Sequence, residues 1–531
     1  MTPIILIDEE PWQLAGEAGT YTRRQTQLLH RNRTMRSPVL ICLLLLPFTD
    51  VFPLKNRMTT DAPMLTSTEA EEIDDVFTKI LRSNKDSTVK LYHGDIVMDT
   101  RYSAIKCPYC LWEKSADGVV TVPYSLASDY SDENKELITA ALETFTTLTC
   151  IRFTERTTEK DYLNIHSGNG CWSSIGKVGG PQPLSLMSSG CMARGVVQHE
   201  INHALGFYHE QSRSDRDEHV DVMWQYINGD DWGEFDLVDT DNMNLPYDYA
   251  SVMHYGRFSY SNTSGQPSLI PKPDQSVDIG QRYGLSPLDV SKVKTLYNCD
   301  ICSFLLTGIN GSLDFETFAS SYKDSTSCVW LVRVNRNRAF LQFDQFDVPS
   351  SAECAAYYLT VYDGQSRTSA VLLDRACGAQ ELPLLVASGN SLLVEFVYEV
   401  PLAAIDLKAS YGLVDCGGTY TSDNGTITSP CYPDLYPNLS DCITTILAPE
   451  GYQIILNFTT FDVEYSNSCL YDYLIINDGG RTDSPLLGRF CSNAPIPPII
   501  STGNLLLLEF RSDNWLNMAG YSANYYFVPS P

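Results

Sequence analysis

The sequence predicts an α+β domain followed by two all-β sandwiches. Helical periodicity is concentrated before Cys299, and the segment 133–148, with apolar residues three and four apart, is a clear example. After Cys299 the pattern changes to strand-like alternation rich in Tyr, Phe and Val. This second part contains a repeat with an offset of 114 residues, from Cys302 to Cys416, which indicates two copies of one domain.

Length and composition support several globular domains. A chain of 531 residues is too long for one hydrophobic core and should form about three domains. With 43% hydrophobic and 19% charged residues, the composition is typical of globular rather than disordered proteins. The net charge of −28 argues against a nucleic-acid partner and against an anionic membrane surface.

The 16 cysteines indicate disulfides formed in an oxidising compartment. Only Cys107 and Cys110 have the C-x-x-C spacing, so a zinc ribbon, which needs two such pairs, is not available. Asn-x-Ser/Thr sequons are compatible with secretion. Downstream of the apolar run at 39–48, these sequons begin at Asn262, Asn310, Asn424, Asn438 and Asn457.

The amino-terminal region contains a segment with the features of a signal peptide. Arg36 precedes an apolar run over 39–48, which is too short to span a membrane. We therefore expect a signal peptide over 35–53 and translation from Met35, with residues 1–34 as a non-native or alternative extension. A signal anchor is the alternative, but no later stretch is long and apolar enough to span a membrane. The product is expected to be secreted and extracellular.

Three histidines form the pattern of a zinc site. His199 and His203 are four residues apart, so on a helix both imidazoles lie on one face and can share a metal ion. Glu200 is placed to hold and deprotonate a water at that metal. Gly206 can adopt a positive φ that ends the helix, and the turn brings in His209 as third ligand. Three protein ligands leave one position for water, as in a catalytic zinc site.

A second motif supports this interpretation. The short H-E-x-x-H pattern occurs by chance in many helices, but here it extends to H-E-x-x-H-x-x-G-x-x-H over 199–209. The segment 251–255 (SVMHY) resembles the Met-turn of the metzincins and would place Met253 beneath the metal. Together they predict a zinc hydrolase. A metal site that has lost activity and a structural helix are the alternatives.

These motifs, with the segment 210–217 (EQSRSDRD), resemble the astacin family, and within it the hatching-enzyme group. The resemblance covers about 200 residues, from Cys107 to Cys299, and its motifs are specific. It implies an α+β metzincin catalytic domain over 102–300, with a five-stranded sheet, helices and a zinc cleft.

The resemblance also implies residue roles. His199, His203 and His209 would bind zinc, and Glu200 would be general base and acid. Tyr255 would be an extra zinc ligand that swings out to stabilise the oxyanion of the tetrahedral intermediate, which a phenol can do as a hydrogen-bond donor.

Residues 54–101 are predicted to be a propeptide. An acidic start and apolar residues at helical spacing predict a short helix over 67–81. The segment 91–96 (LYHGDI) resembles the astacin propeptide's F-x-G-D-I, with Tyr92 in place of Phe. By this resemblance Asp95 is the switch residue that caps the zinc, and a carboxylate is a sound zinc ligand. An ordinary Gly-Asp turn is the alternative.

Activation is expected by a cut after Arg101, which would release Tyr102 as the new amino terminus. Glu210 resembles the family's glutamate that anchors this terminus.

The expected disulfides of the protease domain follow from the resemblance and from the extra cysteines of hatching-type members. The loop closed by Cys150 and Cys299 has about 150 residues, which in the chain-entropy model stabilises the fold by roughly 4–5 kcal/mol. It would tie the two halves of the cleft together. The three pairs are Cys107–Cys110, Cys150–Cys299 and Cys171–Cys191.

Each copy of the repeat carries four cysteines and three shared motifs. The motifs are Phe-Asp-Val (346–348 and 461–463), an Asp-Gly after a strand, and Ser-Gly-Asn or Thr-Gly-Asn before Leu-Leu. They resemble CUB domains, which are β-sandwiches with two successive disulfides, and imply such domains over 302–413 and 416–528. Cys431 is left without a partner, and pairing between molecules and burial both stay open. The implied disulfides are Cys302–Cys328, Cys354–Cys377, Cys416–Cys442 and Cys469–Cys491.

Three carboxylates of the second copy, Glu464, Asp472 and Asp513, resemble the calcium cluster of ligand-binding CUB domains. Oxygen-rich acidic loops suit Ca²⁺, although solvated loop charges are the alternative. The first copy has lost two of the three carboxylates. Its matching residues are Pro349, Tyr357 and Glu399.

The sequence therefore predicts a secreted zinc endopeptidase made as a zymogen, which digests egg-envelope glycoproteins at hatching. The CUB pair is expected to bind protein or glycan. Tolloid-type proteases join a similar catalytic domain to CUB domains but insert cysteine-rich EGF modules. No six-cysteine module lies between Cys377 and Cys416, which excludes that arrangement. One protease domain followed by two CUB domains resembles amphibian-type hatching enzymes. The alternatives are a protease that processes matrix or growth-factor precursors and an inactive CUB-mediated binding protein, against which the intact zinc motif argues.

Overall fold

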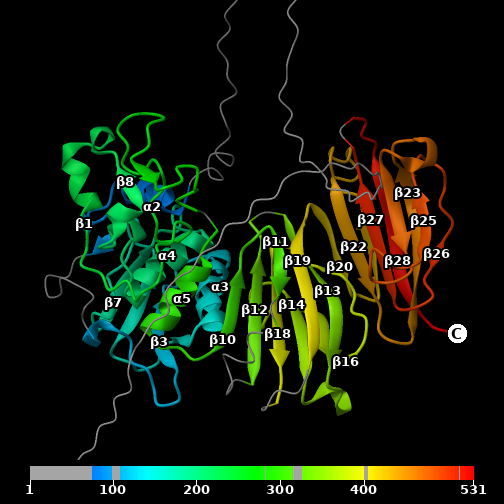
Figure 1. Cartoon of the computed structure of the whole chain (residues 1–531), viewed down its shortest axis with the longest axis horizontal. Coiled ribbons are helices and arrows are strands. Elements are labelled where there is room, and N and C mark those ends of the chain that lie inside the picture. Colours follow the sequence, from blue (N-terminus) through cyan, green and yellow to red (C-terminus); the bar gives the residue numbers. More distant parts are fainter. Residues whose placement is uncertain are drawn as a thin grey trace, which may run out of the picture. The chain divides into compact units, whose positions relative to one another are not determined.

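The computed structural model (Figure 1) describes residues 75–97, 108–281, 283–313, 315, 326–335, 337–399, 405–513 and 515–531. By their contacts these residues belong to one unit. Outside them lie the predicted extension over 1–34, the signal peptide over 35–53, the activation site at Arg101 and Tyr102, and Cys107. Among the described residues, no helix is both long enough and apolar enough to cross a membrane.

The first domain is built on a five-stranded sheet with strand order β4-β3-β5-β7-β6, which confirms the predicted sheet. Four strands are parallel, and the edge strand β6 is antiparallel to β7. In β3, Val120 and Val122 are buried while Thr121 between them is exposed, because side chains alternate across a strand. The strands are β3 (Val120–Leu126), β4 (Ile151–Glu155), β5 (Tyr162–His166), β6 (Cys171–Trp172) and β7 (Pro181–Leu186).

The helices of this domain have identifiable starts and stops. The Ser131 hydroxyl caps the helix that was predicted over 133–148. Gly206, with a φ of 115°, ends the helix that carries His199 and His203. The helices are α3 (Asp132–Leu148), α4 (Arg194–Leu205) and α5 (Pro287–Leu296).

The propeptide helix α2 (Val76–Asn84) differs from its predicted range of 67–81. It starts at Val76 because the carboxylate of Asp75 accepts a hydrogen bond of 2.8 Å from the backbone N–H of Thr78. It continues past Leu81 because its last residue is held against strand β6.

The other short elements are β1 (Leu91–Tyr92), β2 (Ile96–Val97), β8 (Val220–Val222) and β9 (Leu269–Pro271), and 3₁₀ helices at Pro108–Cys110, Glu210–Ser212, Arg216–Glu218, Trp224–Tyr226, Gly229–Phe235, Ala352–Cys354 and Asn467–Cys469.

The two repeat copies are sandwiches with matching strand orders. The first pairs β10-β12-β18-β14-β15 with β11-β19-β13-β16, and the second pairs β20-β22-β27-β24-β25 with β21-β28-β23-β26. This confirms the predicted all-β fold. The first copy contains β10 (Cys302–Leu306), β11 (Asn310–Leu313), β12 (Ser327–Arg333), β13 (Arg338–Val348), β14 (Tyr358–Asp363), β15 (Ala370–Ala376), β16 (Gly378–Ala379), β17 (Leu385–Val386), β18 (Ser391–Val397) and β19 (Asp406–Val414). The second contains β20 (Cys416–Tyr420), β21 (Asn424–Thr428), β22 (Asp441–Leu447), β23 (Tyr452–Asp462), β24 (Tyr473–Asn477), β25 (Leu486–Phe490), β26 (Ile499–Ile500), β27 (Leu505–Arg511) and β28 (Gly520–Pro529).

Strand register explains the first disulfide of each sandwich. Strand β10 runs parallel to β12 with Cys302 opposite Cys328, and β20 repeats this with Cys416 opposite Cys442. The described residues contain these disulfides: Cys150–Cys299, Cys171–Cys191, Cys302–Cys328, Cys354–Cys377, Cys416–Cys442 and Cys469–Cys491. Each joins two cysteines that were predicted to pair. Cys110 is also disulfide-bonded, and Cys431 is free and exposed.

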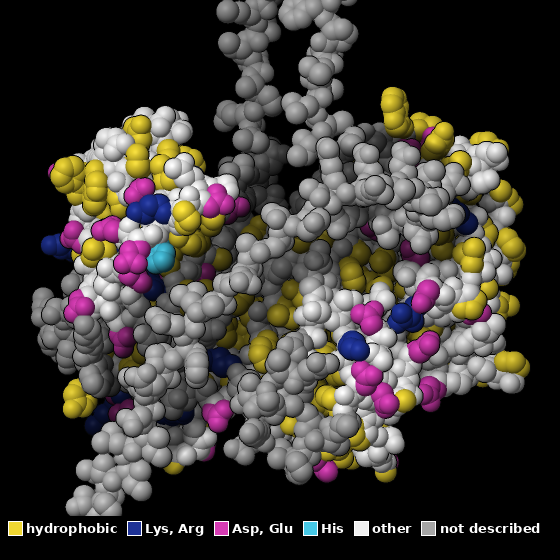
Figure 2. All heavy atoms as spheres, in the orientation of Figure 1, with side chains coloured by type: hydrophobic (Ala, Val, Ile, Leu, Met, Phe, Trp, Pro, Cys, Tyr) yellow, Lys and Arg dark blue, Asp and Glu magenta, His cyan; other side chains and the backbone are white. Residues whose placement is uncertain are grey.

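The hydrophobic core of the protease domain continues into the first sandwich. Leu305, Val329, Leu331 and Leu393 of the sandwich belong to the same buried cluster as the protease residues. The surface is acidic: Figure 2 shows magenta carboxylates spread over the visible face, as expected for 65 Asp and Glu against 37 Lys and Arg.

We predict that the two protease disulfides stabilise unequally. Cys150 and Cys299 are 149 residues apart and Cys171 and Cys191 are 20 apart. In the chain-entropy model, the Cys-to-Ser double variants should therefore lose about 5 and about 3 kcal/mol of stability, respectively. The measurement is the urea dependence of hydrogen exchange in α3 and α4. A larger loss for the shorter loop would contradict the entropic account.

Candidate active site

The structure brings the three predicted histidines together. His199 and His203 lie one turn apart on α4. The backbone N–H of Gly206 donates to the carbonyls of Asn202 and His203, which closes the helix. The chain then turns back, so that Nε2 of His209 lies 3.2 Å from Nε2 of His199. All three imidazoles are fully buried.

The polar atoms of this cluster fit a metal ion. Nδ1 of His199 lies 2.8 Å from the carbonyl of Val252, and Nδ1 of His203 lies 2.7 Å from the carbonyl of Phe207. Because each carbonyl accepts a hydrogen bond from the protonated Nδ1, Nε2 keeps a lone pair that a metal can bind. Nε2 of His203 makes no hydrogen bond, which is costly in a buried site unless a cation lies there. The ligand atoms within 4.8 Å of one another belong to Asp95, His199, His203 and His209.

The fourth member of the cluster, Asp95, comes from the segment predicted to be a propeptide. Its oxygens lie 2.9 Å from Nε2 of His199, 3.3 Å from that of His203 and 3.2 Å from that of His209. Burial by itself raises the pKa of Asp95, but the electrostatic influence of the surrounding imidazoles of His209, His203 and His199 holds it well below 3.8. Asp95 is therefore a carboxylate that closes the histidine cluster.

Glu200 lies beside this cluster without a partner. It is fully buried on α4, and neither of its carboxylate oxygens has a hydrogen-bond partner in the described part of the chain. Burial, and then the negative charge of Asp95, raise the pKa of Glu200 well above 4.5. A carboxyl group with a raised pKa can take up and return a proton near neutral pH.

Tyr255 is held by the propeptide rather than by the histidines. Its hydroxyl donates a hydrogen bond of 2.8 Å to the carbonyl of His93. Its ring stacks on Phe77 of α2, with centroids 3.7 Å apart and planes 17° apart. The ring centroid of His209 is 4.8 Å away, so the phenol lies close to the cluster.

The predicted Met-turn is supported from helix α5. Asp289 accepts hydrogen bonds from the Ser251 hydroxyl at 2.5 Å and from the backbone N–H of Val252 at 2.8 Å. The carbonyl of Met253, which is almost fully buried, accepts from the backbone N–H of Glu210. Asp289 was not among the predicted site residues, although its position three residues after Ser286 fits a capping box, which the structure contains.

Glu210 is already neutralised by two cations. Its Oε2 accepts from Nζ of Lys292 at 2.5 Å, and its Oε1 accepts from Nη1 of Arg213 at 3.2 Å. The backbone N–H of Asp248 also donates to Oε1. The predicted partner of Glu210, an amino terminus at Tyr102, lies outside the described residues.

Asn84, at the end of α2, connects the propeptide to the protease. Its amide nitrogen donates to the carbonyls of Gly94 at 2.9 Å and Cys171 at 2.6 Å, and its oxygen accepts from the N–H of Cys171 at 2.6 Å. Sequence periodicity could not reveal this residue, because it acts through the edge strand 87 positions away.

Glu464, Asp472 and Asp513 of the second sandwich come together, with one carboxylate oxygen of each within 4.8 Å of the others. The Tyr436 hydroxyl donates to Asp472 at 2.6 Å and orients it. Burial, then the charges of Asp472 and Asp513, raise the pKa of Glu464, a repulsion that a cation would relieve. In the first sandwich Tyr357 replaces Asp472, and its described residues contain no such group.

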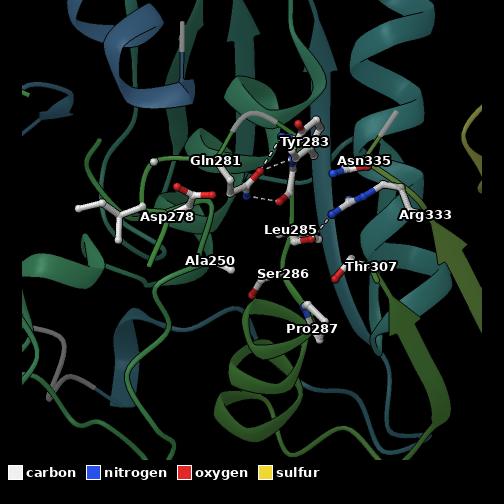
Figure 3. Close-up of a pocket in the computed structure, with 13 residues that line it drawn as sticks. Ala250, Asp278, Gln281, Tyr283, Leu285, Ser286, Pro287, Thr307, Arg333 and Asn335 are labelled. Carbon is white, nitrogen blue, oxygen red and sulfur yellow. Dashed lines mark hydrogen bonds between the residues drawn. The ribbon is translucent and has the colours of Figure 1, made fainter. Parts of the chain in front are cut away.

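A cavity of about 450 Å³ lies between the start of α5 and the first sandwich (Figure 3). Here Nη2 of Arg333 donates to the carbonyl of Leu285 at 2.5 Å. The N–H of Leu285 donates to Gln198, the residue before His199, at 2.9 Å. A single backbone residue thus links the first sandwich to helix α4.

The chain is similar to known proteins over most of its length. The family model described as Astacin, a peptidase family, matches residues 108–298, and the CUB domain model matches residues 302–411 and 416–525. The chain is 43% identical to Embryonic protein UVS.2 of Xenopus laevis, over 87% of this chain and 90% of that protein. It is 46% identical to Astacin-like metalloendopeptidase of Gallus gallus, over 66% of this chain and 86% of that protein. A solved structure, high choriolytic enzyme 1, a hatching enzyme zinc-protease from Oryzias latipes, is 46% identical over 37% of this chain and 100% of its own, with a TM-score of 0.36.

We predict that Asn84→Ala loosens the propeptide. It removes three hydrogen bonds with a net value of roughly 0.5–1.5 kcal/mol each. Hydrogen exchange of residues 91–97 should therefore become about tenfold faster or more, measured on the uncut chain. The exposed neighbour Lys85 supplies the control, because Lys85→Ala removes a side chain without touching this contact. Equal exchange in both variants would contradict the assigned role.

We predict a pH-dependent contribution from Asp248. Burial, then the charge of Asp289, raise the pKa of Asp248 from 3.8 to about 7. A raised carboxyl pKa contributes stability below pH 3.8 that is lost as the pH rises through 7. The urea midpoint of Asp248→Asn minus that of the parent should therefore increase from pH 4 to pH 8. The exposed Asp230→Asn should show no such trend, and a flat difference for Asp248→Asn would refute the assignment.

Proposed function

Because the chain belongs to the astacin family of metallopeptidases, with two CUB domains, we propose that it is a secreted zinc endopeptidase made as a zymogen. The observation that carries the zymogen proposal is the position of Asp95. Its carboxylate oxygens lie 2.9–3.3 Å from Nε2 of His199, His203 and His209. A propeptide carboxylate there excludes both water and substrate from the histidines.

We propose that His199, His203 and His209 hold zinc in the active enzyme. Zinc in this place supplies Lewis acidity, which polarises a carbonyl and favours deprotonation of water. Glu200 then takes the proton of the attacking water and passes it to the leaving amine, for which its buried, unpartnered carboxylate is suited. Tyr255, released from His93, donates a hydrogen bond to the oxyanion.

We propose a signal peptide over 35–53 and a propeptide over 54–101, so that the protein is secreted and activated outside the cell. The disulfides favour an oxidising compartment. Most of the sequon asparagines downstream of the leader are exposed and therefore accessible for glycosylation. The exposed ones are Asn262, Asn310, Asn424 and Asn438.

We propose egg-envelope proteins as substrate, with the CUB pair holding the protease on them. Two features support this: the layout of one protease and two CUB domains, and the similarity to a Xenopus laevis protein named as embryonic. Processing of matrix or growth-factor precursors is the second candidate, because Tolloid-like protein 1 of Mus musculus is 33% identical over 76% of this chain. The two are distinguished by whether cleavage is broad or confined to one or two bonds.

We propose that Glu464, Asp472 and Asp513 hold a calcium ion in the second CUB domain. Three carboxylates at this spacing repel one another, and a hard cation with oxygen ligands removes the repulsion. Bound calcium would order the loops around Glu464 and Asp513 for partner binding.

The test uses the full chain, uncut and cut after Arg101, on casein and on isolated egg envelope. We expect chelator-sensitive hydrolysis by the cut chain alone, because Asp95 closes the histidine cluster in the uncut chain. Glu200→Gln keeps the side-chain shape but removes the base, and should lower the rate by about 100- to 10,000-fold. Asp95→Ala should give the uncut chain part of this activity.

Broad breakdown and swelling of the envelope would support the hatching role, and one or two cuts in casein would favour precursor processing. Bound zinc without hydrolysis by either form would reject the enzyme and leave a CUB-mediated binding protein.

A further inference from the structure

The propeptide fills a space beside the histidine cluster with an aromatic ring. Phe77 is fully buried. Its ring centroid lies 3.7 Å from that of Tyr255 in a stacked arrangement and 5.1 Å from that of His209 in an edge arrangement. Further rings of His199 and Tyr260 lie at 6.2 and 6.3 Å. These distances lie at or near the range in which aromatic rings attract one another.

Most of the surroundings of Phe77 belong to the protease and stay when the propeptide leaves. Two contacts within the protease hold the Tyr260 side chain in place. Its hydroxyl donates to Glu234 at 3.1 Å, and its ring lies edge-on to that of Phe235, with centroids 5.9 Å apart. Phe235 also lies edge-on to Tyr255 at 5.7 Å. A wall of rings supported in this way keeps its shape after Phe77 is removed.

The rest of the enclosure comes from the propeptide itself. A Cβ at Gly94, which has a φ of +84°, would lie 2.6 Å from the Tyr260 hydroxyl and 3.0 Å from the Phe77 ring. Only glycine fits between them. Helix α2 is anchored at its start by a hydrogen bond from the N–H of Val76 to the carbonyl of Gln281. Loss of the propeptide would therefore leave an empty space beside His209 and Tyr255.

We propose that the space filled by Phe77 is a substrate subsite that accepts an aromatic side chain close to the scissile bond, with Tyr260 as the residue that determines this specificity. The subsite adjoins the proposed catalytic residues, because His209 and Tyr255 form part of its wall. The carboxyl group of Glu234 accepts the hydrogen bond of Tyr260, and burial raises the pKa of Glu234 to about 7, so above that pH it places negative charge at the edge of Tyr260 and disfavours an acidic substrate side chain. This inference rests on the proposed endopeptidase function.

The test is hydrolysis of matched peptides by the cut full chain. The peptides carry Phe, Leu, Ala or Asp at one position at a time on either side of the scissile bond. At one position kcat/KM should be about 10- to 100-fold higher for Phe than for Ala, and lowest for Asp. Casein hydrolysis is measured in parallel.

Variants of Tyr260 connect the preference to the proposed wall. Tyr260→Ala should lower the Phe-to-Ala ratio by about 5- to 10-fold, because an aromatic wall is lost. Tyr260→Phe keeps the ring and should retain the ratio. Tyr260→Leu keeps most of the volume and should fall between the two, so the series remains informative if the Ala variant does not fold.

A binding measurement completes the test. A peptide with 4-fluorophenylalanine at the preferred position, bound to cut Glu200→Gln protein, should show a ring-current shift of its fluorine resonance. Tyr260→Leu in the same background should remove most of that shift.

The outcomes separate this inference from the proposed function. No hydrolysis of casein or of any peptide would reject the endopeptidase. Hydrolysis with equal kcat/KM for Phe and Ala at every position would reject the subsite alone, as expected if Tyr255 moves into the vacated space. A Phe preference that survives unchanged in Tyr260→Ala and Tyr260→Leu would also overturn it.

Discussion

The meeting of Asp95 with three buried imidazoles is the interaction on which the first half of the chain depends. Burial lowers the pKa of His203 and lowers that of His209 to about 3, so these imidazoles are neutral ligands near neutral pH. A buried cluster of neutral imidazole nitrogens that faces a carboxylate fits a cation, and Asp95 would be a further ligand of such an ion. In the proposed zymogen, the contact that blocks the site would therefore also satisfy its buried polar atoms.

The protease supports this cluster from several directions. Gly206 turns the chain so that His209 reaches the helix, and Asp289 on α5 holds the Met-turn from the other side. The Cys150–Cys299 disulfide joins the end of α3 to the end of the domain. Because these supports come from segments far apart in the sequence, the geometry of the cluster depends on the whole domain.

Much of this could be read from residue patterns. The zinc motif and the Gly-Asp segment are local in sequence, and the structure brings His199, His203 and His209 together with Asp95. The repeat of cysteines predicted two sandwiches, because a disulfide requires its two residues to face each other and the register of β10 with β12 provides this. The helix at Val76–Asn84 was misplaced in range, since its end depends on a contact with strand β6 rather than on periodicity.

The sequence by itself determined which histidines form the cluster and the order of the domains, because histidine spacing on one helix and cysteine spacing in a repeat are properties of short segments. Only the tertiary structure decided which residues complete the site. Phe77 on Tyr255, Asn84 on Cys171 and Asp289 on Ser251 join positions far apart in the chain. No local pattern encodes such contacts, since they arise from the way the core brings the segments together.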